Sequence, residues 1–346
     1  MKIGLVGFAG SGKTTVFNTL TGLHVPVGYG GEVRLGTVKV PDERIDALSK
    51  IFSPRKTTFA EIVFCDIPGE HGAEKKGLSR KALVQIREQE ALCLVLRAFH
   101  GPAADTEPDP LAELESFHAE CILADLEMVE RRLERAKKDK PSASELAAFE
   151  TMHATLEKEL PLRSIPAGAI NREQLKSFAF LTDRPLLVVL NRDESEAALP
   201  LPDDLKKRLA EIQAAGLVLS ASVEAEIASM EAADQAAFLA DLGLAESALA
   251  RFIRSAYALQ DLISFFTVGE DEVRAWPIKR GSNARQAAGR IHSDLERGFI
   301  RAEVIPYDVF MQYGSEAAVR DAGRQKVEGK DYIVADGDIL HIRFNV

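Results

Sequence analysis

The sequence predicts an α/β fold in which helices cover both faces of a doubly wound, mostly parallel sheet. Three observations support this fold class: a glycine-rich loop follows the first apolar run, later apolar runs end in small polar residues, and helical stretches separate these runs. Nearly continuous apolar runs are typical of strands that are buried on both faces of a parallel sheet. The last third of the chain consists of short strands and turns, which predicts a separate small module.

Length, composition and charge limit the function classes. A chain of 346 residues with 46% hydrophobic content is expected to form two or three domains. No apolar run reaches the roughly 18 to 20 residues of a membrane span and no secretory segment precedes the first strand, so we expect a cytoplasmic protein without a membrane partner. Cys65, Cys93 and Cys121 form no metal-binding pair and are expected to be buried thiols. The net charge of −10 argues against nucleic-acid binding through bulk charge.

The first element is a strand, a glycine loop and a helix at the start of the chain. Residues 2–6 predict a buried strand, 7–14 read GFAGSGKT, and the helical residues follow. Glycines in such a P-loop let backbone N–H groups turn toward phosphates, and the helix adds the positive end of its dipole. We therefore expect Lys13 at the β- and γ-phosphates and Thr14 at Mg²⁺. The expected phosphate-binding residues are Gly7, Phe8, Ala9, Gly10, Ser11, Gly12, Lys13, Thr14, Thr15 and Gly69.

Two segments occupy the positions of nucleotide-sensing switches. The glycine-rich residues 22–36 predict a loop at the first switch. A strand at 37–40 and a helix at 41–51 are expected to follow. The strand at 59–67 carries Asp66 at its tip, where we expect a carboxylate that holds Mg²⁺, and the second switch is expected to follow it.

A helical insertion is expected to interrupt the sheet. Residues 92–99 predict a buried strand, and three prolines within 101–110 mark an exit from the nucleotide domain. Residues 111–160 have apolar side chains at intervals of two to four, with a break at 137–144. This pattern predicts two helices that form an antiparallel hairpin.

The sheet is expected to resume after the hairpin. Residues 184–191 and 217–220 each predict a strand, and polar residues follow at 191–194 and 220–222. Ligands bind at the carboxyl ends of the strands in a doubly wound sheet, so these polar residues are candidates for a binding site. Residues 237–259 predict further helix.

The C-terminal module is expected to be α+β, with a single helix at 284–292. Its expected strands are 265–268, 272–277, 301–305, 332–334 and 339–344. The expected domains are a P-loop NTPase domain in two parts, 1–109 and 173–262, the helical hairpin insertion at 110–172 and the C-terminal module at 263–346.

The C-terminal third also shows a family resemblance. Residues 265–305 (FFTVGEDEVRAWPIKRGSNARQAAGRIHSDLERGFIRAEVI) and 328–346 (EGKDYIVADGDILHIRFNV) resemble the YchF proteins, Obg-related P-loop NTPases that end in a ubiquitin-like TGS module. The resemblance extends through VPDERIDAL, IREQEALCLVLRAF, ILADLEMVERRLER and SASVEAEIA. It implies an NTPase domain with a helical insertion, a C-terminal β-grasp (TGS) domain and association with the ribosome through its large subunit.

The choice of base depends on residues 191–194, which read Asn-Arg-Asp-Glu. In GTPases the sequence Asn-Lys-x-Asp uses its aspartate to accept hydrogen bonds from guanine. Glu194 occupies that position here, and adenine lacks those donors, so ATP is expected to bind better than GTP. YchF proteins also carry Asn-x-x-Glu and prefer ATP, so the resemblance implies Asn191 and Glu194 as base-site residues. The other expected base-site residues are Ser220, Ala221 and Ser222.

Three departures from the family pattern concern catalysis. Gly10 stands where YchF proteins usually have an asparagine tied to monovalent-cation use, and Gly30 falls near the first-switch threonine. Glu70 and His71 follow Asp-x-x-Gly, where the family has an apolar residue, and they are the candidate catalytic residues. We expect slow, Mg²⁺-dependent hydrolysis of ATP. An Obg-type GTPase and a regulatory module that binds nucleotide without hydrolysis remain open as alternatives.

A local basic segment is the candidate RNA contact. Residues 274–301 contain seven lysines and arginines against two acidic residues, with Trp276 among them. Phosphate pairing and base stacking favour a local contact with ribosomal RNA. The alternative is a solvated face with Trp276 in the core.

Overall fold

The computed structural model describes residues 2–26, 32–68, 80–100, 107–139, 141–244 and 246–345. The chain forms two compact units. The first consists of Met1–Val38 and Val63–Leu259, and the second of Lys39–Ile62 and Gln260–Val346. The two units are described separately here.

The first unit is built on a six-stranded sheet with the order β2-β4-β1-β5-β6-β7. Its strands are β1 (Lys2–Val6), β2 (Arg34–Lys39), β4 (Glu61–Asp66), β5 (Ala91–Ala98), β6 (Leu186–Arg192) and β7 (Ala215–Leu219). The pairs β1–β4, β1–β5, β5–β6 and β6–β7 are parallel. The strand order reverses around β1, which confirms the predicted doubly wound, mostly parallel sheet.

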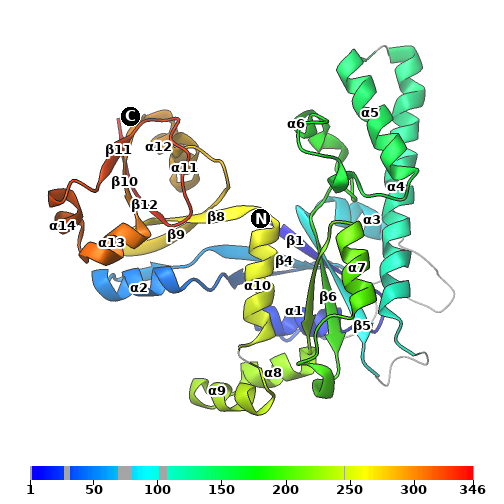
Figure 1. Cartoon of the computed structure of the whole chain (residues 1–346), viewed down its shortest axis with the longest axis horizontal. Helices are drawn as coiled ribbons and strands as arrows, with labels where there is room; N and C mark the ends of the chain where they lie inside the picture. The colour runs from blue at the N-terminus through cyan, green and yellow to red at the C-terminus, as the bar shows by residue number, and fades with distance from the viewer. Residues whose placement is uncertain are drawn as a thin grey trace. The chain divides into compact units, whose positions relative to one another are not determined.

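Helices cover this sheet on both sides (Figure 1). On one side α3 (Arg80–Arg87), α4 (Pro110–Asp139) and α7 (Asp203–Glu211) contribute to one apolar core with β5 and β6. On the other side α1 (Lys13–Thr21) lies beside α8 (Ala221–Ser229), and α10 (Ala248–Leu259) packs on β6 and β7. Because both faces are covered, every residue of β6 is buried, which explains the continuous apolar run in the sequence.

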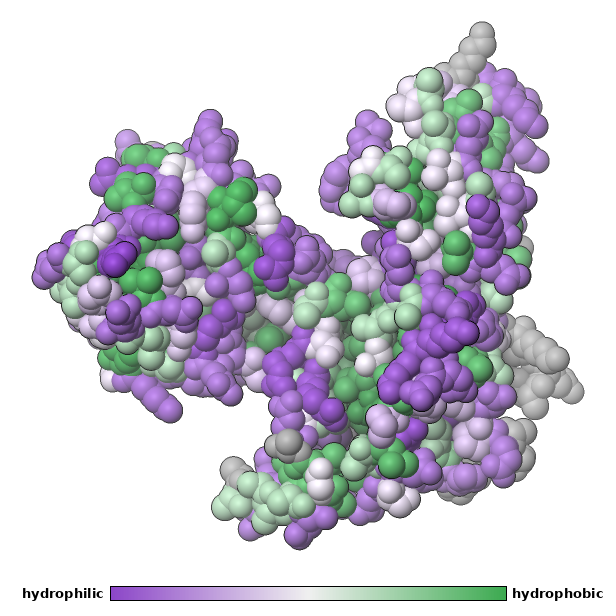
Figure 2. Space-filling view, in the orientation of Figure 1, coloured by the Kyte–Doolittle hydropathy of each residue, from purple (hydrophilic) through white to green (hydrophobic). Residues whose placement is uncertain are grey.

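The predicted helical hairpin is formed by α4 and α5 (Ala143–Leu156). Ser142 ends the break between them, because its side chain caps α5 by accepting a hydrogen bond from the Glu145 backbone N–H at 3.2 Å. An apolar core between the helices includes Val129 and Phe149. Hydrophilic residues dominate the visible outer surface of the hairpin (Figure 2), as expected for an amphipathic pair.

The second unit contains a mixed sheet with the order β11-β10-β12-β8-β9-β3. Its strands are β3 (Lys56–Thr58), β8 (Leu262–Thr267), β9 (Glu272–Lys279), β10 (Phe299–Pro306), β11 (Lys326–Glu328) and β12 (Asp338–Phe344). β8 pairs antiparallel with β9 and parallel with β12, and α11 (Ala284–Ile291) shares a core with these strands. This is the arrangement expected of a β-grasp domain.

Residues 39–62 pair with the C-terminal part of the chain, although the sequence analysis assigned them to the nucleotide-binding segment 1–109. β3 adds to the edge strand β9 in parallel. On α2 (Glu43–Phe52), the Phe52 ring stacks on Phe310 with centroids 5.3 Å apart, and Arg44 contacts Asp336 at 3.2 Å. Pairing between segments more than two hundred residues apart leaves no local mark in the sequence.

Two expectations about local structure were wrong, and the helix expected at 237–259 is present but interrupted. Residues 332–334 form no strand, because buried Asp338 accepts hydrogen bonds from Tyr332 Oη and Ala335 N and holds this segment as a loop with one isolated bridge. The stretch 237–259 forms two helices, α9 (Ala232–Asp241) and α10, since Gly243 adopts a left-handed φ of 68° between them. The C-terminal module also has more than the single helix expected, namely α12 (Ser293–Arg297), α13 (Tyr307–Tyr313) and α14 (Glu316–Asp321).

The three cysteines are free and buried, as predicted. Burial raises the pKa of the Cys65 thiol to about 11. None of the described helices combines the length and the apolar character that crossing a membrane requires.

Candidate nucleotide-binding site

The glycine loop lies between β1 and α1, as predicted. Gly10 and Gly12 both adopt left-handed backbone conformations, with φ of 81° and 82°. Gly12 is the N-cap of α1 and has no side chain to cap the helix, so the first-turn N–H groups of α1 are left for another acceptor. A helix start of this kind is suited to binding an anion.

Close packing explains two of the glycines. A Cβ atom at Gly12 would overlap the Asn191 Nδ2 atom, and one at Gly7 would lie 2.7 Å from the backbone oxygen of Val95. Ser11, between them in sequence, is fully buried, and its Oγ has no hydrogen-bond partner. A buried hydroxyl without a partner inside this loop is consistent with a ligand that completes the site.

Asp66 brings together two of the predicted site residues. It ends β4 beside Leu5 of β1, and its carboxylate is paired with the Lys13 ammonium group. The Thr14 hydroxyl lies 3.3 Å from Asp66 Oδ2. Lys13 and Asp66 are both buried, at 7% and 4% exposure, so this is a shielded ion pair.

The electrostatics of Lys13 reflect this burial. Desolvation lowers the pKa of Lys13, the Asp66 carboxylate opposes that shift, and Arg34 adds to it. Arg34 Nη1 lies 4.0 Å from Asp66 Oδ2. Arg34 was not predicted as a site residue, and its only signal was its position near the end of the glycine-rich first-switch segment 22–36.

The oxygens of Thr14 and Asp66 fit the role of Mg²⁺ ligands. Mg²⁺ prefers hard oxygen ligands and usually takes only one or two from the protein, with substrate phosphates and waters completing the shell. Among the described residues, no group of three or more His, Cys, Asp or Glu side chains is arranged to hold a metal on its own. The site therefore suits a metal ion that arrives with a nucleotide.

Asn191 connects the P-loop to the predicted base site. Its amide Nδ2 donates to the backbone oxygen of Ser11 at 3.0 Å, and its Oδ1 accepts from the backbone N–H of Ala221 at 3.0 Å. Asn191 is 3% exposed. Ser220 Oγ and Ser222 Oγ lie 3.0 Å apart on the same segment. The structure thus brings Asn191, Ser220 and Ala221 together at the edge of the P-loop.

The acidic residues of the 191–194 sequence lie apart from this bridge. Glu194 is exposed at the start of a short 3-10 helix (Glu194–Glu196). Asp193 accepts a hydrogen bond from the backbone N–H of His100 at 3.3 Å. A neighbouring Glu107 carboxylate, with Asp193, raises the pKa of His100. Asp193 is therefore engaged in the protein, whereas Glu194 is free to face a ligand.

The remaining predicted residues divide into two groups. Phe8 is half-buried against the core, Ala9 is exposed, and the Thr15 carbonyl accepts a hydrogen bond from Thr19 Oγ1. Four predicted positions lie outside the described residues, namely Gly30, Gly69, Glu70 and His71.

Two protein-family models match the chain. The model described as "50S ribosome-binding GTPase" matches residues 2–129. A YchF GTPase C-terminal model, described as "Protein of unknown function (DUF933)", matches residues 262–345. Together the matches cover the P-loop segment and the C-terminal unit.

Full-length relatives extend this match over the whole chain. "Ribosome-binding ATPase YchF" of Bacillus subtilis is 38% identical and that of Haemophilus ducreyi 39% identical, with 100% of this chain and 100% and 99% of the relatives covered. The structure of the Schizosaccharomyces pombe YchF GTPase matches with a TM-score of 0.89 at 29% identity, over 99% of this chain and 97% of that one. A P-loop joined to a C-terminal β-grasp unit, shared at this identity over the full length, shows that the chain belongs to the YchF family of P-loop NTPases.

Proposed function

We propose that this protein is an Mg²⁺-dependent ATPase that hydrolyses ATP slowly and uses its nucleotide state to change its affinity for the ribosome. The observation that supports the chemistry most strongly is the convergence of Lys13 and Thr14 on Asp66 at the uncapped start of α1. The relatives named ribosome-binding ATPases support both the nucleotide and the partner.

The site residues have distinct roles in this proposal. Lys13 exchanges its Asp66 carboxylate for the β- and γ-phosphates, because a triphosphate offers more negative charge to the same ammonium group. Thr14 and Asp66 are the residues that would hold Mg²⁺, which would neutralise phosphate charge when bound. Arg34 contributes a second cation close to the same carboxylate. Gly69, Glu70 and His71 remain the proposed second-switch residues.

Base selection is assigned to the 191–194 segment. Asn191 positions the P-loop against Ala221, and Glu194, three positions later in the sequence, is exposed to solvent. Adenine lacks the N1–H and 2-amino donors of guanine, so a carboxylate in the guanine-reading orientation would gain nothing from ATP. The longer Glu194 is proposed to lie outside that orientation and to leave room for adenine.

The ribosomal contact is proposed to use the basic segment of the second unit. Arg274 lies over the Trp276 ring at 3.9 Å, and Trp276 is only partly buried against the core. A paired arginine and indole offer both phosphate binding and a stacking surface. Arg280 and Arg297 form closer ion pairs, with Asp261 and Asp294. Arg274 Nη1 lies 4.0 Å from Glu272 Oε2, which is a looser pair, so we assign the contact to the face that carries Arg274.

Two measurements test this proposal. Phosphate release from ATP should require Mg²⁺ and should be abolished in Lys13→Ala, whereas Lys50→Ala, on the exposed side of α2, should retain the wild-type rate. Pelleting of the protein with ribosomes should differ between an ATP analogue and ADP, and Arg274→Glu should weaken pelleting without changing hydrolysis. Equal pelleting in both nucleotide states would contradict the switch, and turnover by Lys13→Ala would contradict the assigned site.

A further inference from the structure

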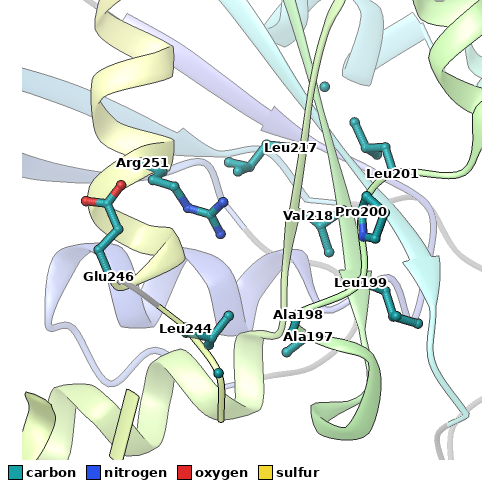
Figure 3. Close-up of a pocket in the computed structure, with 12 residues that line it drawn as sticks. Ala197, Ala198, Leu199, Pro200, Leu201, Leu217, Val218, Leu244, Glu246 and Arg251 are labelled. Carbon is teal, nitrogen blue, oxygen red and sulfur yellow. The ribbon is translucent and has the colours of Figure 1, made fainter. Parts of the chain in front are cut away.

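A cavity in the first unit is lined by none of the residues assigned to the nucleotide site. It has a volume of about 500 Å³, within the range of small-molecule sites. Its walls come from three segments that contain none of the predicted site residues: the stretch after the 3-10 helix of Glu194, the edge strand β7, and the connection between α9 and α10 with the first turns of α10 (Figure 3). The cavity therefore requires a separate explanation.

Most of the side chains that line the cavity are aliphatic, and Glu246 and Arg251 add polar surface. Leu199 and Leu201 lie on one side, Leu217 and Val218 come from β7, and Leu244 comes from the α9–α10 connection. None of the described residues that line the cavity is aromatic. An aliphatic lining favours a flexible hydrocarbon body over an aromatic ring, which gains from stacking partners.

Arg251 is the one cation among the lining residues that the structure describes. Figure 3 shows its side chain extending from α10 toward Leu217 and Val218. Its Nε is buried and has no hydrogen-bond partner, and the guanidinium makes no ion pair with any residue that the structure describes. A buried Nε without an acceptor is unfavourable, so an anionic group that enters the cavity would be held by this half-buried arginine.

The two nearest carboxylates in sequence are already engaged. Glu246 lines the cavity but points away from it in Figure 3, and both of its oxygens accept hydrogen bonds from Arg254, at 2.6 and 2.7 Å. Glu224 is 3% exposed and caps the start of α10 by accepting from the backbone N–H groups of Ala248 and Leu249. The charge of Arg251 therefore remains available to a ligand.

We propose that this cavity binds an aliphatic carboxylate, with the hydrocarbon chain against the leucines and the carboxylate on the Arg251 guanidinium. A carboxylate matches the planar fork of one arginine, whereas a phosphate dianion would call for further donors that the lining does not supply. A free aliphatic acid and the C-terminus of an apolar peptide share this chemistry. The experiment below separates the two.

The full-length protein is titrated with hexanoate, octanoate and decanoate, and binding is measured by calorimetry. Saturable binding at one site should tighten about fourfold for each added CH₂ group, as expected from burial of hydrocarbon. Decanol, which matches the chain but lacks the charge, should bind at least about tenfold more weakly than decanoate. Acetyl-Ala-Leu-Leu with a free or an amidated C-terminus forms the peptide arm.

Two variants identify the cation. Arg251→Gln should lower the affinity for decanoate to that for decanol, whereas Arg131→Gln, which alters an exposed arginine of α4 outside the cavity lining, should leave it unchanged. The unfolding temperature of ligand-free Arg251→Gln should equal or exceed that of the wild type, because the buried Nε donor without a partner is removed. That control separates lost binding from lost folding.

The outcomes are decisive in both directions. Binding of decanoate that depends on Arg251 assigns the site to a free acid, and tighter binding of the free-carboxylate peptide than of decanoate assigns it to a peptide terminus. Equal affinities of Arg251→Gln and the wild type for decanoate, equal affinities of decanol and decanoate, or no saturation by any probe at about 1 mM would overturn the proposal.

Discussion

Replacement of Gly12 by alanine tests the bridge between the P-loop and the base site. The left-handed backbone at this position costs a non-glycine residue about 1–2 kcal/mol. A Cβ would also overlap Asn191 Nδ2, so the Asn191 amide must move and lose its bonds to Ser11 and Ala221. Two such hydrogen bonds contribute about 1–3 kcal/mol in total. We therefore expect Gly12→Ala to lower the local unfolding free energy by about 2–5 kcal/mol.

Gly10→Ala is the matched control for this experiment. Gly10 has nearly the same φ, 81° against 82°, but a Cβ there would meet nothing within 4 Å. Gly10→Ala should lower the local unfolding free energy only by the cost of the left-handed backbone, about 1–2 kcal/mol. The difference between the two variants isolates the contact with Asn191.

Hydrogen exchange read by mass spectrometry over α1 and α8 is the appropriate assay. The only tryptophan, Trp276, lies in the second unit, so its fluorescence would not report on this site. In an Asn191→Ala background the extra cost of Gly12→Ala over Gly10→Ala should disappear, as a double-mutant cycle requires for two residues in contact. Equal costs of the two glycine replacements in the wild-type background would refute the reasoning.

Three further predictions follow from the described contacts. Arg34→Gln should weaken ATP binding by about tenfold or more in a fluorescence titration, because a cation near Asp66 is lost. Burial lowers the pKa of His118 in the folded protein. The contribution of His118 to stability is therefore complete above its unfolded pKa of about 6.5 and is lost as the pH falls through the folded pKa. His118→Gln should flatten the acid side of the curve of unfolding free energy against pH, measured by urea unfolding. Arg44→Leu should lower both the hydrogen-exchange protection of α2 and the unfolding midpoint followed by Trp276 fluorescence, since Arg44 links α2 to Asp336 within the second unit.

Each of these has a control and a contradicting result. Arg55→Gln, an exposed arginine of the second unit, should leave ATP affinity unchanged, and an equal loss in both variants would remove Arg34 from the site. His24→Gln, on an exposed loop, should keep the wild-type pH curve, and an unchanged curve in His118→Gln would remove that histidine as its cause. Loss of α2 protection without a change at Trp276 would contradict the assignment of α2 to the second unit.

Local signals in the sequence were enough for the central part of the fold. The apolar run before GFAGSGKT, the Asp66 tip of β4 and the break before α5 each predicted their element, because strand burial, helix dipoles and caps act over a few residues. These signals also placed Lys13, Thr14 and Asp66 at one site. The residues of the P-loop site can therefore be predicted from the sequence.

The contacts that were missed join residues far apart in the chain. Asn191 meets Ser11 across 180 positions, so its bridging role is invisible in the 191–194 motif alone. The pairing of β3 with β9 likewise depends on tertiary structure. Arg34 reaches Asp66 only because β2 and β4 are neighbours in the sheet. Local periodicity does not encode such neighbours.

Competition between ATP and GTP in the presence of Mg²⁺, followed by phosphate release from both, tests the central claim most directly. The proposed function predicts tighter binding of ATP and slow release of phosphate that is lost in Lys13→Ala. Tighter binding of GTP would contradict the role given to Glu194. Tight binding of ATP without turnover would contradict the ATPase and leave a nucleotide-binding regulatory module.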